Sequence, residues 1–188
     1  MDPVTATSAA VLYAAKKAID ALLGKKIPEW FSEISEKVRD EFSTKISEYH
    51  DVQSKYYSEI KTILTSNSPK KFEKIYYPLS ISSQRSLTNE NVNTITHCSI
   101  NNVFTHSNYI LIFGSAGSGK SCLIKHLFLG CIKENFSIPI LIELRNLNHI
   151  DCSIKNFIMK EILDYKIQNC EKDLECILSS GAFTFFFD

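Results

Sequence analysis

The sequence predicts a mixed α/β fold, in which an N-terminal α-helical domain precedes the first strands of a parallel sheet with flanking helices. Two observations support this prediction. One apolar stripe at helical spacing continues from Pro28 to Leu64 without an internal glycine or proline, which indicates a long amphipathic helix. Beyond residue 105, short apolar runs alternate with helical patterns, as they do where a parallel sheet is buried on both faces.

The N-terminal helical domain is expected to cover residues 1–68. Residues 5–23 form a first amphipathic pattern, which Gly24 ends as a left-handed cap. The stripe of residues 28–64 forms the second pattern, and a break near His50 would leave it intact. Amphipathic helices need a partner for their apolar faces, so we expect these helices to pack together or to self-associate with another chain.

A connecting segment with one or two short strands is expected at residues 69–104, where Pro78 lies inside the extended-looking "IYYPLSI". Residues 105–188 are expected to form the α/β part. Its predicted strands are "NYILIF" at 108–113, "IPILIEL" at 138–144 and "AFTFFFD" at 182–188. Its predicted helices are 120–132, 154–165 and 171–179.

Charge and cysteine content narrow the possible partners. Lysine and arginine balance aspartate and glutamate, so no basic field indicates nucleic acid or an anionic membrane. Six cysteines form no CxxC pair, which favours reduced thiols in the cytoplasm. Lys16, Lys17 and Asp20 interrupt the N-terminal apolar patch, so neither a spanning helix nor a signal peptide is expected. Contact of this helix with a membrane surface remains an alternative to packing in a bundle.

A glycine-rich loop carries the clearest chemical signal. The loop is Gly114-Ser115-Ala116-Gly117-Ser118-Gly119-Lys120-Ser121, a full match to GxxxxGK[ST] between an apolar run and a helical pattern. Glycines let several backbone N–H groups turn toward one point, and the helix that begins there adds its positive end. Lys120 would place an ammonium against the β and γ phosphates, and the Ser121 hydroxyl would bind Mg²⁺. We expect the loop, with the following Cys122, to bind a nucleotide and magnesium.

Asp188 is the second candidate ligand of this site. It ends the apolar run "GAFTFFFD", and a carboxylate at the end of a buried strand can orient the water around Mg²⁺. A turn or helix cap is the alternative role for such an aspartate. Other residues carry weaker signals. Arg145 could contact a phosphate or a partner, Cys122 and Trp30 are expected to pack, and His126 is expected on the surface.

The loop, "IPILIELRNLN" and "GAFTFFFD" together resemble the opening half of a NACHT module, a branch of the STAND class of P-loop NTPases, over about residues 105–188. The helices followed by "FEKIYYPLSI" are similar to the helical domains that precede NACHT modules in bacterial proteins. The resemblance implies a switch that binds ATP or ADP, with Gly114 to Ser121 on the phosphates and Asp188 on the magnesium. It also implies oligomerisation that controls the N-terminal helices, a separate sensor of an unknown trigger, and a role in antiphage defence or innate immunity.

Two other functions stay open at this point. A constitutive AAA-type ATPase would carry the same loop, and a helical interaction module could retain it as a vestigial nucleotide site. In the NACHT class, further acids and a strand inserted next to the P-loop strand normally follow the position of Asp188. We therefore expect this sequence to be the first part of a longer module. No catalytic residue can be assigned, and hydrolysis is expected to be slow or conditional.

Overall fold

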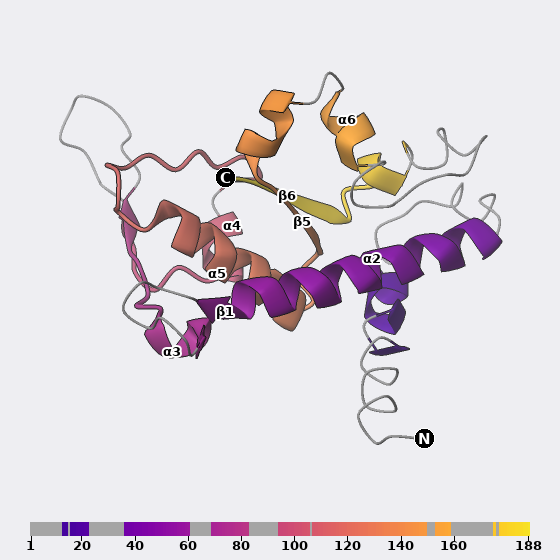
Figure 1. Cartoon of the computed structure of the whole chain (residues 1–188), viewed down its shortest axis with the longest axis horizontal. Helices are drawn as coiled ribbons and strands as arrows, with labels where there is room; N and C mark the ends of the chain where they lie inside the picture. Colours follow the sequence, from indigo (N-terminus) through magenta and orange to yellow (C-terminus); the bar gives the residue numbers. More distant parts are fainter. Residues whose placement is uncertain are drawn as a thin grey trace. The chain divides into compact units, whose positions relative to one another are not determined.

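The computed structural model describes residues 13–14, 16–22, 36–60, 69–82, 94–105, 107–149, 153–158, 175 and 177–188. These residues form helices and small sheets, including one parallel pair of strands, which confirms the mixed α/β class (Figure 1). The chain divides into two compact units. One unit combines residues 1–56 with residues 137–188, and the other is residues 57–136. This division differs from the three sequence blocks 1–68, 69–104 and 105–188.

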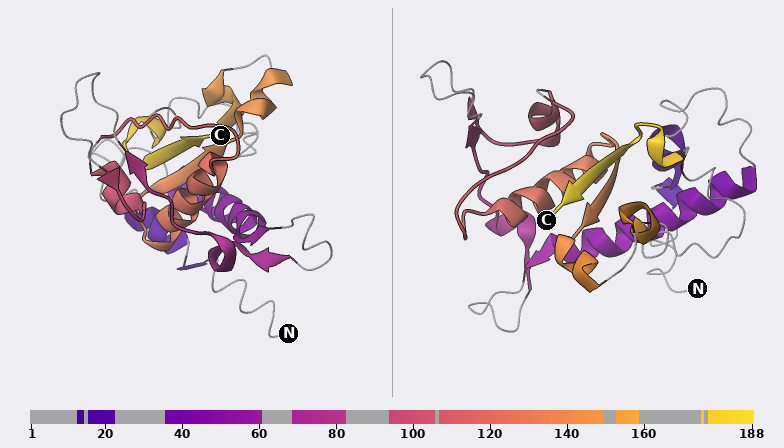
Figure 2. Two further views of the ribbon diagram at one scale, coloured as in Figure 1. Left: turned by 90° about the vertical axis from the view of Figure 1, so that its left-hand side faces the viewer. Right: turned by 90° about the horizontal axis from the view of Figure 1, so that it is seen from above.

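Two parallel strands form the centre of the first unit. They are β5 (Ile138–Ile142) and β6 (Phe183–Phe187), paired from Ile138 opposite Phe183 to Ile142 opposite Phe187. The common direction of the two strands can be followed in Figure 2. All five residues of β5 are buried, as expected for a strand of continuous apolar composition that is covered on both faces. The predicted strands at 138–144 and 182–188 are therefore confirmed.

A short helix covers one face of this strand pair. Ile140 and Ile142 of β5 form a buried cluster with Phe157 and Ile158, which lie in and directly after α6 (Ile154–Phe157). The Ser153 side chain accepts a hydrogen bond from the Asn156 backbone N–H and so caps the start of α6. The predicted helix at 154–165 is thus confirmed at its start, and its residues after 158 lie outside the described part of the chain.

The long helix α2 (Glu36–Ser58) continues through His50 without the break that the sequence left open. Its 23 residues correspond to a length of about 35 Å. The buried face contains Phe42 and Ile46, and it also contains three polar residues, Ser43, Ser47 and His50. The predicted stripe is wrong in its second half, where the side chains of Val52 and Tyr56 are exposed by 61% and 65%.

Side chains of α2 close the outer edge of β5. The N–H of Ile138 donates to Ala182 O, and the C=O of Ile142 accepts from the N–H of Asp188, so alternate β5 residues bond toward β6. Pro139 and Leu141 therefore face the other edge. The Tyr49 hydroxyl accepts from the Leu141 N–H at 3.0 Å and donates to the Leu141 C=O at 3.3 Å, and His50 Nε2 lies 3.0 Å from the Pro139 C=O.

Proline suits this outer edge because it has no N–H to leave unpaired. The His50 ring is buried, with its Nε2 atom 3.0 Å from the Pro139 carbonyl oxygen, and this burial lowers the pKa of His50 to about 4. Burial likewise raises the pKa of Tyr49 to about 12. Both side chains are therefore neutral at pH 7. A charged form would be costly where α2 packs against the apolar strand β5.

The second unit is built around α5 (Lys120–Lys133), which confirms the predicted helix at 120–132. Its buried residues are Leu123, Leu127, Phe128 and Cys131. Around it lie small elements that precede it in the chain: β1 (Glu59–Ile60), β2 (Lys70–Lys71), α3 (Phe72–Ile75), β3 (Ile81–Ser82), β4 (Thr94–Ile95) and α4 (Ile100–Phe104). β1 pairs with β2 and β3 pairs with β4, both antiparallel. The described part of the connecting segment at 69–104 therefore contains three two-residue strands, β2, β3 and β4, where one or two were expected.

The strand predicted at 108–113 is wrong. Residues 110–115 have no regular secondary structure. Tyr109, Leu111 and Phe113 expose 93%, 78% and 83% of their surface. An apolar run becomes a strand only when a neighbouring strand accepts its backbone hydrogen bonds, and no described strand pairs with this segment.

Several expectations fall outside the described residues. They concern most of the helix predicted at 5–23, most of the one at 171–179, Gly24 and Trp30. The described parts of these two segments are helical, namely residues 13–14, 16–22, 175 and 177–179. Cys98, Cys122 and Cys131 carry free thiols. Within the part of the chain that the structure describes, no helix has both the length and the apolar composition needed to cross a membrane.

Candidate phosphate-binding loop

Two residues of the glycine-rich loop have backbone conformations that favour glycine. Gly117 and Gly119 both adopt positive φ, at 76° and 86°. Side chains other than hydrogen are disfavoured at such angles, so these two positions need glycine. The Ser118 N–H donates to Ser115 O at 3.2 Å and closes a tight turn, after which Gly119 caps the first turn of α5. The loop thus turns sharply and passes directly into a helix.

The loop is compact as well as turned. A Cβ atom on Gly114 would come within 2.7 Å of Ser118 Oγ, so a larger residue at position 114 would require the Ser118 side chain to move. The residues from Gly114 to Ser118 are nevertheless exposed to solvent. A ligand could therefore reach the backbone of the loop.

Lys120 folds back over the loop that precedes it. Its ammonium donates to the carbonyl oxygens of Gly114 and Ser115, both at 2.8 Å. These carbonyls are neutral acceptors, whereas hydrogen bonds from an ammonium to an anion are stronger. An anion above the loop would therefore compete well for the Lys120 ammonium.

The start of α5 supplies backbone donors to the same place. The Leu123 N–H donates to Gly119 O at 2.9 Å and is the first hydrogen bond of the helix. The amides of the turn before it have no acceptor inside the helix, and the helix dipole adds partial positive charge there. Ser121 and Cys122 lie in this turn and are exposed. Cys122 was expected to pack, and its exposure corrects that interpretation.

Asp188 lies at the carboxyl end of β6, in the first unit. Its N–H donates to Ile142 O at 3.0 Å and its C=O accepts from the Leu144 N–H at 2.7 Å, so both backbone groups are fixed to β5 and the turn after it. That turn is η3 (Leu144–His149). Asp188 is exposed. Asp188 therefore combines a backbone fixed by hydrogen bonds with a carboxylate that a metal ion could reach.

Arg145 has a carboxylate partner at the same end of the sheet. Its Nε and Nη2 atoms donate to Glu143 Oε2 at 3.0 and 2.6 Å, and this hydrogen bond is the main reason that the pKa of Arg145 is raised, with Asp188 adding a smaller effect. Most of the Arg145 side chain is exposed. The ion pair is sufficient to explain Arg145, and nothing else assigns it to a phosphate.

His126 is not the surface residue that the sequence indicated. Its ring stacks on Tyr76, with centroids 4.3 Å apart and planes 18° from parallel. Burial lowers the pKa of His126, an effect that a hydrogen bond with the Cys98 backbone opposes. His126 is therefore a packing residue on the side of α5, and only the three-dimensional structure shows its partner.

Leu79 is a neighbour of the loop that the sequence did not indicate. A Cβ atom on Gly119 would come within 2.9 Å of Leu79 Cδ1, so this leucine lies directly against the glycine that caps α5. In the sequence, Leu79 lies 40 residues before Gly119 in a segment expected only to connect. The one local signal is Pro78, which favours an extended backbone before it.

Magnesium binding requires side chains that donate oxygen ligands. The Ser121 hydroxyl and the Asp188 carboxylate are of this type, and Mg²⁺ typically takes only one or two protein ligands besides phosphate and water. Among the described residues, no group of three or more His, Cys, Asp and Glu side chains could hold a metal ion without such help. Each of these two oxygen donors, taken by itself, is of the type that a magnesium ion arriving with a nucleotide would accept.

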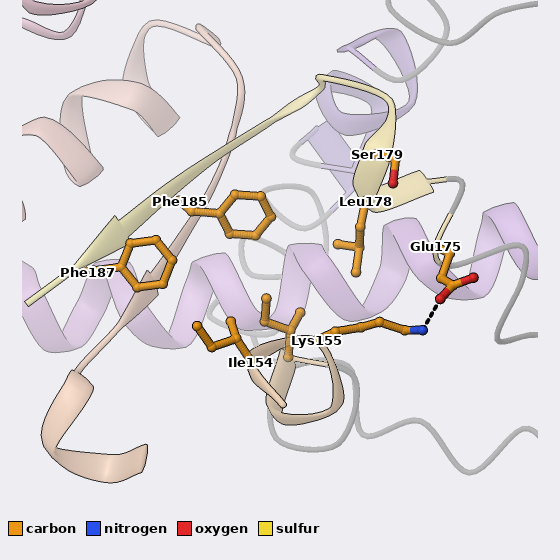
Figure 3. A pocket seen from close by; sticks show the side chains of 8 residues that line it. Ile154, Lys155, Glu175, Leu178, Ser179, Phe185 and Phe187 are labelled. Carbon is orange, nitrogen blue, oxygen red and sulfur yellow. Dashed lines mark hydrogen bonds and ion pairs between the residues drawn. The ribbon is translucent and has the colours of Figure 1, made fainter. Parts of the chain in front are cut away.

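A pocket of about 440 Å³ lies elsewhere, on the first unit (Figure 3). Phe185 and Phe187 of β6 line it together with Ile154 and Leu178, and the ion pair of Lys155 with Glu175 lies at its margin. Successive strand residues point to opposite faces, so the side chain after Phe187 is directed away from this pocket. The pocket is thus apolar and separate from the predicted ligands.

Comparisons with protein-family models, with curated proteins and with solved structures found no match for this chain. The assignment of a function therefore depends on the residues and their geometry.

Proposed function

We propose that Gly114–Ser121 binds the phosphates of ATP or ADP together with Mg²⁺, and that the protein is a nucleotide-dependent switch of the NACHT type. The conformation of the loop is the observation that supports this most. Two glycines at positive φ turn the backbone into the N-terminus of α5, and the Lys120 ammonium lies over the loop, where it donates to the neutral carbonyls of Gly114 and Ser115. A simple connecting turn would need neither Lys120 nor Ser121.

Each residue would act through ordinary electrostatics. The backbone N–H groups of the loop and of the first turn of α5 would donate to phosphate oxygens. Lys120 would exchange the carbonyls of Gly114 and Ser115 for the β and γ phosphates. The Ser121 hydroxyl and the Asp188 carboxylate would hold Mg²⁺, which offsets phosphate charge when it is bound. Adenine is preferred over guanine because of the NACHT resemblance alone.

Switching would follow from differential affinity. A triphosphate that binds one arrangement of the protein more tightly shifts the population toward it, and hydrolysis or exchange for ADP reverses the shift. In a NACHT protein, that arrangement would oligomerise and control the N-terminal helices. Slow or conditional hydrolysis fits such a role better than steady turnover, since a switch must remain in one state long enough to signal.

Titration of the full chain with ATP and magnesium by isothermal calorimetry tests the proposal. Wild-type protein should show saturable binding, and Lys120→Ala should abolish measurable binding because it removes the ammonium that lies over the loop. Lys74→Ala, which removes an exposed lysine of α3, is the matched control and should bind as wild type does. Equal binding by Lys120→Ala and wild type, or no binding by either, would refute the assignment.

A further inference from the structure

Residues 73–79 follow α5 along its whole length and make three regularly spaced contacts with it. At the carboxyl end of the helix, Glu73 Oε1 lies 3.6 Å from Lys133 Nζ. Near the middle, Tyr76 stacks on His126. At the amino end, Leu79 lies against Gly119. We call residues 73–79 the strap.

From Tyr76 to Leu79, the spacing of the contacts matches the geometry of the two segments, whereas residues 73–75 belong to α3 and rise less along the helix axis. On α5 they are seven residues apart, which is close to two full turns, so all three lie on one face of the helix. On the strap they are three residues apart. From Tyr76 to Leu79 the backbone begins extended, with Tyr76 at φ −64° and ψ 122°, and three extended residues reach about 10 Å. Seven helical residues rise by about the same distance, about 10.5 Å. The strap and the helix therefore stay aligned as far as Gly119.

The backbone at Leu79 is fixed by contacts of the residues before and after it in the chain. Before it, Phe72 is buried and stacks on Tyr76 with ring centroids 5.1 Å apart. At Leu79 itself, the C=O accepts a hydrogen bond from the Cys98 N–H at 3.2 Å. After it, β3 pairs with β4, which fixes the continuation of the chain. The leucine side chain is thus presented to Gly119 from a firmly held backbone.

We propose that Leu79 is a positioning residue of the phosphate loop, which acts by holding Gly119 in its left-handed conformation before a phosphate arrives. Gly119 has no side chain of its own to restrict it, and a free glycine visits many backbone conformations. A loop that is already ordered loses less entropy on binding and so binds more tightly. This inference rests on the proposed nucleotide site. It adds a residue, 40 positions earlier in the chain, that sets the affinity of that site.

Affinity for ATP with magnesium, measured on the full chain by calorimetry, tests the inference through three variants. Leu79→Ala removes the contact with Gly119 and should weaken binding by about tenfold, equivalent to about 1.4 kcal/mol. Leu79→Met restores a side chain of similar volume and should recover most of the affinity. Ile75→Ala shortens an exposed aliphatic residue that makes none of the three contacts, and it should bind as wild type does.

The outcomes separate this inference from the proposed function. If wild-type protein fails to bind the nucleotide, the proposed function is refuted and the role of Leu79 with it. If wild-type protein binds and folded Leu79→Ala binds equally tightly, the nucleotide site stands and the positioning role is refuted. Circular dichroism establishes that each variant is folded, and loss of affinity in Leu79→Met as severe as that in Leu79→Ala would also contradict the inference.

A comparison that needs no ligand tests the contact itself. Gly119→Ala should lower the melting temperature both through strain at φ 86° and through the 2.9 Å approach of its Cβ to Leu79 Cδ1. Only the second effect disappears when Leu79 is also alanine. The decrease caused by Gly119→Ala should therefore be smaller in the Leu79→Ala background. Equal decreases in the two backgrounds would show that Leu79 does not press on Gly119.

Discussion

Two apolar runs of the chain look alike in sequence and differ completely in structure. "NYILIF" at 108–113 and "IPILI" at 138–142 both consist almost wholly of large apolar residues. The second is β5, in which all five residues are buried. The first has no strand structure, and Leu111 and Phe113 expose about four-fifths of their surface. Composition therefore does not decide which run becomes a strand.

The two runs differ in what lies on either side of them. β5 has β6 along one edge, and the Tyr49 and His50 side chains bond its other edge. No described strand lies beside residues 108–113. Backbone groups that leave water need partners, so a segment with none stays exposed however apolar its side chains are.

Shortening a β5 side chain should have the largest effect. Ile140 is fully buried and packs with Ile142, Phe157 and Ile158, so Ile140→Ala should lower the free energy of unfolding by about 2–5 kcal/mol. Urea unfolding followed by far-ultraviolet circular dichroism measures this. Ile140→Val, which removes one methyl group, is the graded control at about 0.5–1.5 kcal/mol. If Ile140→Ala lowered the free energy of unfolding by less than the range expected for Ile140→Val, β5 would not be part of the core.

Acidification should loosen the outer edge of β5 by a smaller amount. The folded-state pKa of His50 is about 4, below the value of about 6.5 expected in the unfolded chain. The unfolded state therefore binds the proton more readily, and the stability that neutral His50 contributes is present above about pH 6.5 and lost as pH falls toward about 4. Between about pH 7.5 and about pH 5 the loss should be about 2 kcal/mol.

The matched variant for this effect is His50→Gln, whose amide can still donate to the Pro139 C=O but does not titrate in this range. Urea unfolding of both proteins at the two pH values isolates the contribution of His50 from that of the other histidines. An identical pH dependence in wild type and His50→Gln would mean that the His50 ring is hydrated in the folded protein.

The smallest effect is expected in the exposed run. Leu111 is 78% exposed, so Leu111→Ala should change the free energy of unfolding by no more than about 0.5 kcal/mol. The same urea experiment measures it, with Ile140→Ala as the reference for a buried position. A loss as large as that of Ile140→Ala would show that residues 108–113 are buried in solution after all.

Local features of the sequence predict β5, β6, α5 and the turn of the glycine-rich loop because these depend on short-range patterns. The glycines, Lys120 and Ser121 are adjacent in the chain, and the apolar runs at 138–144 and 182–188 are continuous. Two of the failures concern distant partners. Neither the missing partner of 108–113 nor the stack of Tyr76 on His126 leaves a trace in local spacing, since each depends on segments tens of residues apart.

The polar residues on the buried face of α2 also show that local spacing does not reveal distant partners. Helical periodicity identified Phe42 and Ile46 correctly, because apolar side chains at this spacing are buried against some partner in most folds. It could not identify His50 as buried, because His50 is satisfied by a carbonyl that lies 89 residues further along the chain. Only a fold that is already assembled supplies that carbonyl.

The bonds between α2 and β5 also bear on how the chain folds as it is made. Tyr49 and Leu141 are 92 residues apart, so closing this contact requires a long loop, a slow step when a whole chain refolds from denaturant. Synthesis runs from the N-terminus, and α2 is therefore complete before Pro139 and Leu141 are added. The edge of the new strand meets its hydroxyl and imidazole partners soon after it emerges, which shortens the time during which it could pair with the strand of another nascent chain.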